Sequence, residues 1–220
     1  MTKKKIVSLC LAAVLVVMAV AGATVAYFND TKSETNTFTL GNVQIKLDET
    51  DITDSTKRTE TGNDYGAMYP GRTVTKDPTV HNVGANSAYI RAKVTINNAI
   101  NMLPLLFQDM TFENGTTFNE QYFQYFTALV GELGEGWSFV GIEGSGADMT
   151  FVFKYDTVLA KDTDTTPIFS SLTIPASYDG KDANGGYIAE SVTNMTIVAE
   201  AMQVESFDTW EAAFTAFDGQ

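Results

Sequence analysis

The amino-acid sequence predicts a mainly β protein, a β-sandwich with inserted and C-terminal helices. Two observations carry this expectation. Stretches in which apolar and polar residues alternate recur along most of the chain, which is typical of strands with one face in a core. Two shorter stretches instead repeat their aromatic residues at helical spacing. No internal repeat or low-complexity tract interrupts the pattern, and we expect a single domain over residues 27–220.

A basic and apolar leader precedes this region. Lys3, Lys4 and Lys5 are followed by an almost wholly apolar run over residues 6–26, a pattern typical of a secretory signal peptide. We therefore expect residues 1–26 to direct export, and the mature protein to be secreted to the extracellular matrix or the cell surface. The alternative is an uncleaved anchor, because an apolar run of this length could span a bilayer.

Two bonds fit the small residues that a signal peptidase requires. Cleavage after Ala26 leaves Tyr27 as the first residue, just before the polar chain starts at Asn29. Cleavage after Ala23 is the alternative. We favour the bond between Ala26 and Tyr27, since the polar sequence begins there.

Charge and cysteine content exclude several classes of function. The chain has 27 acidic residues against 14 Lys and Arg, a net charge of −13, and loss of the leader with its three lysines gives −16. Nucleic-acid binding needs clustered cations on phosphate, so it is excluded. Cleavage also removes Cys10, the single cysteine of the chain. Disulfides and cysteine-based zinc sites are therefore excluded in the mature protein.

Four stretches alternate strictly and predict half-buried strands. The clearest is 87–96, where small and aliphatic residues form one face and Tyr89, Arg91, Lys93 and Thr95 the other. The others are residues 148–156, the inward row Met195, Ile197, Ala199 and Ala201, and the row Val43, Ile45 and Leu47; shorter candidates are 72–80, 137–142 and 167–174.

Two segments predict helices whose aromatic faces belong in the core. Thr117 and Glu120 form a capping box at the start of the first, and Ser206 is the expected N-cap of the second. Gly131 and Gly219 are expected to end them. The two faces consist of Phe118, Tyr122, Phe126 and Leu129, and of Phe207, Trp210, Phe214 and Phe217; the polar stretches 48–66 and 180–186 are expected to be solvated loops.

His81 is the single histidine and the obvious candidate for catalysis or metal binding. It alternates with Val80 on the strand-like stretch from Arg72, so it shares the face of Thr75, Asp77 and Thr79, which we expect to face solvent. Neither a HExxH helix nor a second imidazole accompanies it. The sequence also lacks a G-x-S-x-G elbow for a serine nucleophile. We therefore expect no catalytic residues and no metal site.

Oxygen-rich loops nevertheless leave weak calcium binding open, against the expectation of no cofactor. The segment 179–185 resembles part of an EF-hand loop, but Gly180 and Ser191 stand where that loop needs carboxylates at its first and twelfth positions. The acidic segments 162–164 and 48–54 are equally unspecific.

Two blocks of short motifs carry a resemblance to a known family. The first reads AYFNDTKS at 26–33, NTF at 36–38 and GNV at 41–43; the second reads YPGR at 69–72, VTK at 74–76, VHNVG at 80–84 and AYIRAKV at 88–94. In order and spacing these blocks resemble the TasA/camelysin family of Firmicutes, whose members are exported through a dedicated signal peptidase called SipW. The likeness extends to AEAMQ at 199–203 and WE at 210–211.

The resemblance implies a jelly-roll-like β-sandwich whose relatives assemble into biofilm matrix fibres. In fibre-forming relatives the mature N-terminal segment inserts as a donor strand into the next subunit. In this chain that segment is 27–40, which is Thr-rich and free of proline. The residues expected to mediate polymerisation are Tyr27, Phe28, Phe38 and Leu40, with Gly41 as the hinge. Alternatively, the segment is the first strand of its own sheet.

Two further classes of function stay open beside a non-enzymatic fibre subunit. Camelysin-like relatives are described as cell-surface metallopeptidases, although this sequence offers one histidine and no zinc motif. A surface sandwich with exposed aromatic residues could also be an adhesin that does not polymerise. The expected partners are other copies of the chain, other matrix or surface proteins, and the signal peptidase during export. Contact with the membrane is expected through the signal peptide alone.

Overall fold

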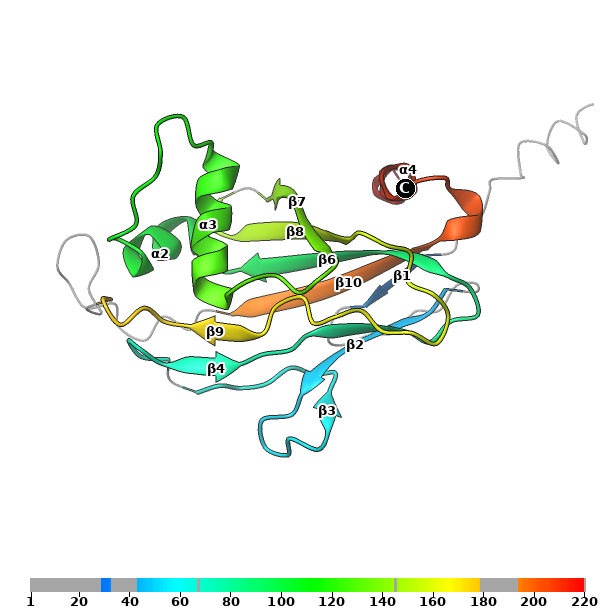
Figure 1. Ribbon diagram of the computed structural model, residues 1–220, viewed down its shortest axis with the longest axis horizontal. Helices are drawn as coiled ribbons and strands as arrows, with labels where there is room; N and C mark the ends of the chain where they lie inside the picture. The colour runs from blue at the N-terminus through cyan, green and yellow to red at the C-terminus, as the bar shows by residue number, and fades with distance from the viewer. Residues whose placement is uncertain (1–28, 33–42, 67, 145, 179–193, 220) are drawn as a thin grey trace, which may run out of the picture.

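The computed structural model describes residues 29–32, 43–66, 68–144, 146–178 and 194–219 (Figure 1). Strands dominate these residues, and two helices are inserted between strands while a third ends the chain, so the predicted mainly β class is confirmed. The elements are β1 (Asn29–Lys32), β2 (Ile45–Thr50), β3 (Arg58–Thr59), β4 (Thr73–Thr75), β5 (Thr79–Asn82), β6 (Ala88–Ile96), α2 (Ala99–Leu106), α3 (Phe118–Val130), β7 (Trp137–Glu143), β8 (Met149–Tyr155), β9 (Ser171–Thr173), β10 (Met195–Gln203), the 3₁₀ turn Val204–Ser206, and α4 (Trp210–Asp218).

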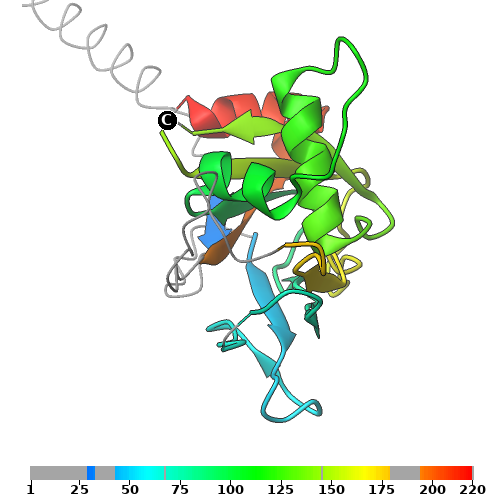
Figure 2. The ribbon, with the colours of Figure 1, turned by 90° about the vertical axis from the view of Figure 1, so that its left-hand side faces the viewer.

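The strands of the described residues form three antiparallel sheets. The largest has the order β1-β10-β6-β8-β7, and the others have the orders β3-β2-β5 and β4-β9. Figure 1 shows β2, β4 and β9 below the five-stranded sheet and α4 above it, and Figure 2 shows the same separation from the end that carries α2 and α3. The strands are thus layered, but their division among three sheets does not confirm the jelly-roll arrangement that the family resemblance implied.

The core lies between the five-stranded sheet and the layer that contains β2 and β5. The inward row of β6, from Ala88 to Ile96, is fully buried at every second residue, as the alternation predicted. Val43 and Ile45 from the opposite layer are also fully buried. The two layers therefore bury their apolar faces against each other, the arrangement in which period-two strands are most stable.

The predicted strand 72–80 is wrong as a single element. It divides into β4, which pairs with β9, and β5, which pairs with β2. The break falls at Asp77 and Pro78; a proline lacks the N–H that continues a ladder. The Asp77 carboxylate accepts hydrogen bonds from the backbone N–H and the hydroxyl of Thr50, at 2.7 and 2.8 Å, which turns this stretch toward β2.

Helix α3 begins and ends where the sequence indicated. The capping box between Thr117 and Glu120 is complete, and Gly131 is the C-cap. Phe126 packs on the inward rings of Phe151 and Phe153, with ring centroids 4.6 and 5.2 Å apart. Tyr122 and Leu129 share this buried face, whereas the predicted core residue Phe118, the first residue of the helix, is 51% exposed.

Helix α2 was not predicted, since it is short and contains Pro104. A proline inside a helix leaves the carbonyl four residues earlier without its usual donor. Here that carbonyl belongs to Ile100, and the hydroxyl of Tyr122 on α3 donates to it at 2.8 Å. The bond therefore replaces the missing helical hydrogen bond and joins α2 to α3.

Helix α4 covers the outer face of the five-stranded sheet. Its N-cap is Thr209, whose hydroxyl accepts from the Ala212 N–H at 3.1 Å, so the predicted cap Ser206 is wrong; Ser206 ends the preceding 3₁₀ turn. Gly219 is the C-cap, as predicted. The predicted aromatic face of this helix packs in a cluster of its own, formed by Met202, Ala213 and Phe214 with Tyr89, Phe207, Trp210 and Phe217.

Arg91 fixes this helix to the sheet. The sequence placed Arg91 on the polar face of β6, yet the residue is 2% exposed, because α4 covers it. Its guanidinium donates to Asp218 through two bonds of 2.7 and 2.6 Å and pairs with Glu200 on β10. It also lies over the ring of Phe214, 4.4 Å from the centroid. A buried cation of this kind is stable only because two carboxylates and an aromatic face surround it.

Several predicted features lie outside the described residues. They are the leader with the cleavage site Ala26 and Tyr27, the polymerisation residues Tyr27, Phe28, Phe38, Leu40 and Gly41, and the loop 179–185. Within the part that is described, none of the helices has the length and apolar character needed to cross a membrane.

We expect Tyr122→Phe to lower the free energy of unfolding by about 1 kcal/mol, because the Ile100 carbonyl loses its donor. Pro104→Ala restores a backbone N–H that can donate to the same carbonyl. In that background Tyr122→Phe should cost clearly less, which a double-mutant cycle in urea measures. Equal losses in both backgrounds would show that the Tyr122 hydroxyl does not substitute for the helical bond.

Candidate functional site

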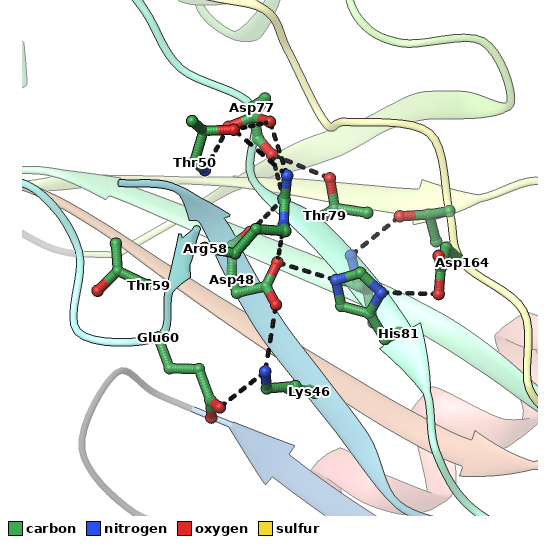
Figure 3. A network of polar contacts seen from close by, with 12 residues as sticks. Lys46, Asp48, Thr50, Arg58, Thr59, Glu60, Asp77, Thr79, His81 and Asp164 are labelled. Carbon is green, nitrogen blue, oxygen red and sulfur yellow. Dashed lines mark hydrogen bonds and ion pairs between the residues drawn. The ribbon is translucent and has the colours of Figure 1, made fainter. Parts of the chain in front are cut away.

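A network of charged side chains lies where β2, β3 and β5 meet (Figure 3). It contains His81, the single histidine and the sequence's candidate for catalysis or metal binding. Its members come from four separate parts of the chain and are Lys46, Asp48, Thr50, Arg58, Glu60, Asp77, Thr79, His81 and Asp164.

Asp48 is the centre of this network. Its side chain is 4% exposed, and it accepts hydrogen bonds from Arg58 Nε and, at 2.9 Å, from His81 Nε2. Lys46 Nζ lies 3.4 Å from its second oxygen. Burial alone would raise the pKa of Asp48, but the bonds from Arg58 and His81 outweigh it and hold that pKa below its ordinary value.

Arg58 joins this centre to the turn before β5. Its Nη1 donates to Asp77 Oδ2 at 2.8 Å, and its Nη2 donates to the backbone carbonyls of Asp48 and Asp77 at 3.1 and 3.0 Å. Burial would raise the pKa of Asp77, yet the two bonds from Thr50 and the guanidinium of Arg58 lower it. One guanidinium thus ties β2, β3 and the start of β5 together, a use for which its planar fork of donors is suited.

His81 has a carboxylate at each ring nitrogen. Nε2 faces Asp48 at 2.9 Å and Nδ1 faces Asp164 Oδ1 at 2.7 Å. The histidine side chain is 19% exposed, so the solvent-facing position that the sequence indicated is wrong. The reason is that the chain breaks before β5 and that the segment with Asp164 pairs along the free edge of this strand, which the alternation could not show.

A second buried pair lies on the other side of β2. Lys76 Nζ is 2.7 Å from Glu49 Oε2, and the two side chains are 7% and 5% exposed. The Tyr65 hydroxyl donates to the same oxygen at 3.2 Å. Burial, and then the charge of Glu49, raise the pKa of Tyr65 well above its ordinary value, so this hydroxyl stays a donor.

The arrangement is suited to joining strands. A carboxylate faces each nitrogen of His81. The pocket beside the network, between Asp48, Glu49, Glu60 and Lys76, has room for about one water molecule. In the described ranges, no three His, Cys, Asp or Glu side chains are placed to hold a metal ion together.

The sequence identified His81 as a candidate but missed its partners. Asp48 was assigned to a solvated loop over 48–66, which is wrong at its start, because Asp48 and Glu49 are buried on β2. Asp164 belongs to a segment that the sequence leaves as an unspecific candidate for calcium, and in the structure it faces His81. One signal was available: Lys46 and Asp48 alternate with the apolar residues of their strand, so they had to share a face with whatever lies opposite.

The described part of the predicted donor segment is β1. It pairs with β10 in antiparallel register, from Asn29 opposite Met202 to Lys32 opposite Ala199. This is the alternative that the sequence left open, a first strand in the sheet of the same chain. The network around Asp48 is separate from this pairing and belongs to the other layer.

Comparison with known proteins gives one match. Residues 1–102 match the model of a family described as camelysin metallo-endopeptidase. The matched stretch contains β1 to β6, and with them Asp48, Arg58 and His81, but it ends before Asp164. Neither the curated proteins nor the solved structures gave a match.

We expect Asp48→Asn to lower the free energy of unfolding at neutral pH by roughly 3 kcal/mol, because it breaks a buried ion pair. The pKa of Asp48 is lowered on folding, so its ionisation stabilises the fold above the unfolded value of about 3.9 and is lost as the pH falls through the lower folded value. The acid loss of stability should therefore be shallower in Asp48→Asn.

Urea unfolding at a series of pH values measures both effects. Asp109→Asn is the matched control, since Asp109 is an exposed aspartate on the loop after α2. An Asp48 variant as stable as the control, with the same pH dependence as the wild type, would contradict a central role for this carboxylate.

Proposed function

Over residues 1–102 the chain belongs to the TasA/camelysin family, and from this premise we propose that it is a secreted structural subunit of extracellular matrix fibres. Copies of the mature chain assemble head to tail, each donating its N-terminal segment 27–40 as a strand to the next. Such an association is heterologous and propagates without closing. The protein is non-enzymatic, needs no cofactor, and has other copies of itself and further surface proteins as partners.

The pairing of β1 is the observation that supports this proposal. β1 is the edge strand of the five-stranded sheet, and four residue pairs join it to β10. Main-chain hydrogen bonds between strands do not depend on which chain supplies the strand. The same segment from a second copy can therefore make the same bonds, and exchange of one for the other leaves the hydrogen-bond count unchanged.

The rest of the sheet is built to stay in place during such an exchange. β10 pairs with β6 over nine residue pairs, against four with β1. Its inward residues Ile197, Ala199 and Ala201 are buried in the core and do not rely on β1 for their anchoring to β6. Loss of β1 would expose the edge of β10 without unfolding the sheet. Strand donation requires such a free edge as the acceptor.

The family's description names a second function, that of a metallo-endopeptidase. The single histidine of this chain is the residue that such an activity would need first. Its two nitrogens are engaged by Asp48 and Asp164, which favours a structural role. An adhesin that does not polymerise is a third function, and no surface feature of the residues that the structure describes favours it.

We expect the purified mature chain to form filaments, and deletion of residues 27–40 to abolish them. Negative-stain electron microscopy of both proteins measures this. A synthetic peptide of residues 27–40 should bind the shortened chain one to one, and it should also stop the growth of wild-type filaments because it occupies the acceptor edge.

Replacement of residues 27–40 by a Gly/Ser stretch of equal length is the matched control. It keeps the length of the segment and removes its strand-forming residues, so it too should fail to assemble. Filaments of unchanged form from either variant would show that assembly does not use this segment.

We expect no chelator-sensitive proteolysis by the purified mature chain. Cleavage of an unfolded protein substrate, followed by electrophoresis with and without EDTA, tests this expectation. Cleavage that EDTA stops and His81→Ala abolishes would instead establish the peptidase function and remove the structural role assigned to His81.

A further inference from the structure

The two hydrogen bonds of His81 require more protons than a neutral imidazole carries. A carboxylate can only accept a hydrogen bond, so each ring nitrogen must bear a hydrogen to bond the oxygen in front of it. Asp48 faces Nε2 at 2.9 Å and Asp164 faces Nδ1 at 2.7 Å. A neutral imidazole has one N–H, and the imidazolium has two. The observed geometry is therefore that of the charged ring.

Asp164 belongs to an irregular stretch that lies along the free edge of β5, here called the covering segment (residues 159–168). Backbone bonds hold it there: Asp162 N–H donates to the Asn82 carbonyl at 3.0 Å, Asn82 N–H to the Thr163 carbonyl at 2.9 Å, and Thr165 N–H to the Val80 carbonyl at 2.9 Å. His81 and Asp164 face each other in the middle of this run. Their side-chain contact therefore fastens the covering segment to β5 and, through Asp48, to β2.

We propose that His81 is a proton-dependent clip: its charged form joins the covering segment to the β2–β5 sheet, and its neutral form releases Asp164. This device is independent of the proposed fibre function, since it lies in the layer that does not contain β1.

The two carboxylates differ in what their release would cost. Asp48 is 4% exposed, and its pKa is lowered, so it stays ionised and needs donors from the protein. The Asp164 side chain is 61% exposed, so water can replace the histidine. A neutral His81 consequently keeps its one hydrogen on Nε2, toward Asp48, and turns a bare Nδ1 toward Asp164. The lone pairs of Nδ1 and of the Asp164 carboxylate then repel each other, and the contact between His81 and Asp164 opens.

Charges of both signs surround the ring. Lys46 is the cross-strand neighbour of His81, and Arg58 shares the Asp48 carboxylate with it. Both cations are already paired with carboxylates, whereas Asp164 has no cation besides His81 within ion-pair distance in the described part of the chain. The groups that face the ring or its partners are Lys46 and Asp48 on β2, Arg58 on β3, Glu60 after it, Asp77 before β5, and Lys161, Asp162 and Asp164 on the covering segment.

The single histidine makes the test direct, because a ¹⁵N-labelled sample gives one imidazole. Long-range ¹H–¹⁵N spectra distinguish the imidazolium from each neutral tautomer across about pH 5 to 8, the range in which histidines change charge. We expect both nitrogens to be protonated at the low end and the Nε2–H tautomer at the high end. Over the same range we also expect a change in amide hydrogen exchange. After correction for the intrinsic effect of pH, the Asp162 and Thr165 amides should exchange roughly fivefold faster once His81 is deprotonated, as expected for loss of a partly exposed ion pair.

Asp164→Asn removes the negative partner and should abolish this step in exchange rate. Asp162→Asn is the matched control: its carboxylate is 73% exposed on the same segment and does not contact His81, so the step should remain. Three results would overturn the proposal: a neutral Nδ1–H tautomer, exchange that is indifferent to the charge of the ring, or a step that survives in Asp164→Asn. The tautomer is measured on the wild type, so that result does not depend on how the variants fold.

Discussion

The buried carboxylate of Asp48 is the interaction on which the second layer of the structure depends. That layer has few residues in regular strands: β2 and β5 are short, β3 is shorter still, and the covering segment is irregular. Main-chain pairing alone would hold such elements weakly. The carboxylate of Asp48 pairs with Arg58, His81 and Lys46. Arg58 in turn pairs with Asp77, and His81 with Asp164. A buried charge makes the assembly specific, because any other arrangement would leave it without donors.

The five-stranded sheet is organised by a different force. Apart from β1 its strands are long and their inward rows are apolar; helix α3 covers these rows with Phe126, while α4 closes the outer face over Arg91. Here burial of apolar surface dominates and the polar contacts are secondary. The contrast bears on the proposed assembly, in which a sheet held by β6, β8 and β10 would exchange its short edge strand β1 and keep its core. The polar layer has no such redundancy.

The fold was predictable where the information is local. Alternation with period two identified β6, β8 and β10, since a strand with one buried face needs nothing else to be recognised. The capping box identified the start of α3 for the same reason, because its two partners are three residues apart. Local signals failed where a distant partner decided the outcome: Pro104 sits in a helix because Tyr122 takes up the freed carbonyl, and Thr209 rather than Ser206 caps α4.

The candidate site shows the same division most sharply. By itself the sequence determined that the chain is acidic, that its strands are amphipathic, and that one histidine is available, because these follow from composition and short-range order. Only the tertiary structure decided that Asp48 is buried rather than part of a solvated loop, that Arg91 lies under a helix, and that His81 stands between two carboxylates. The burial of a charged side chain is set by its partners, and these partners lie on strands and loops far apart in sequence. The residue pattern along one strand therefore cannot predict whether a charged side chain on that strand is buried.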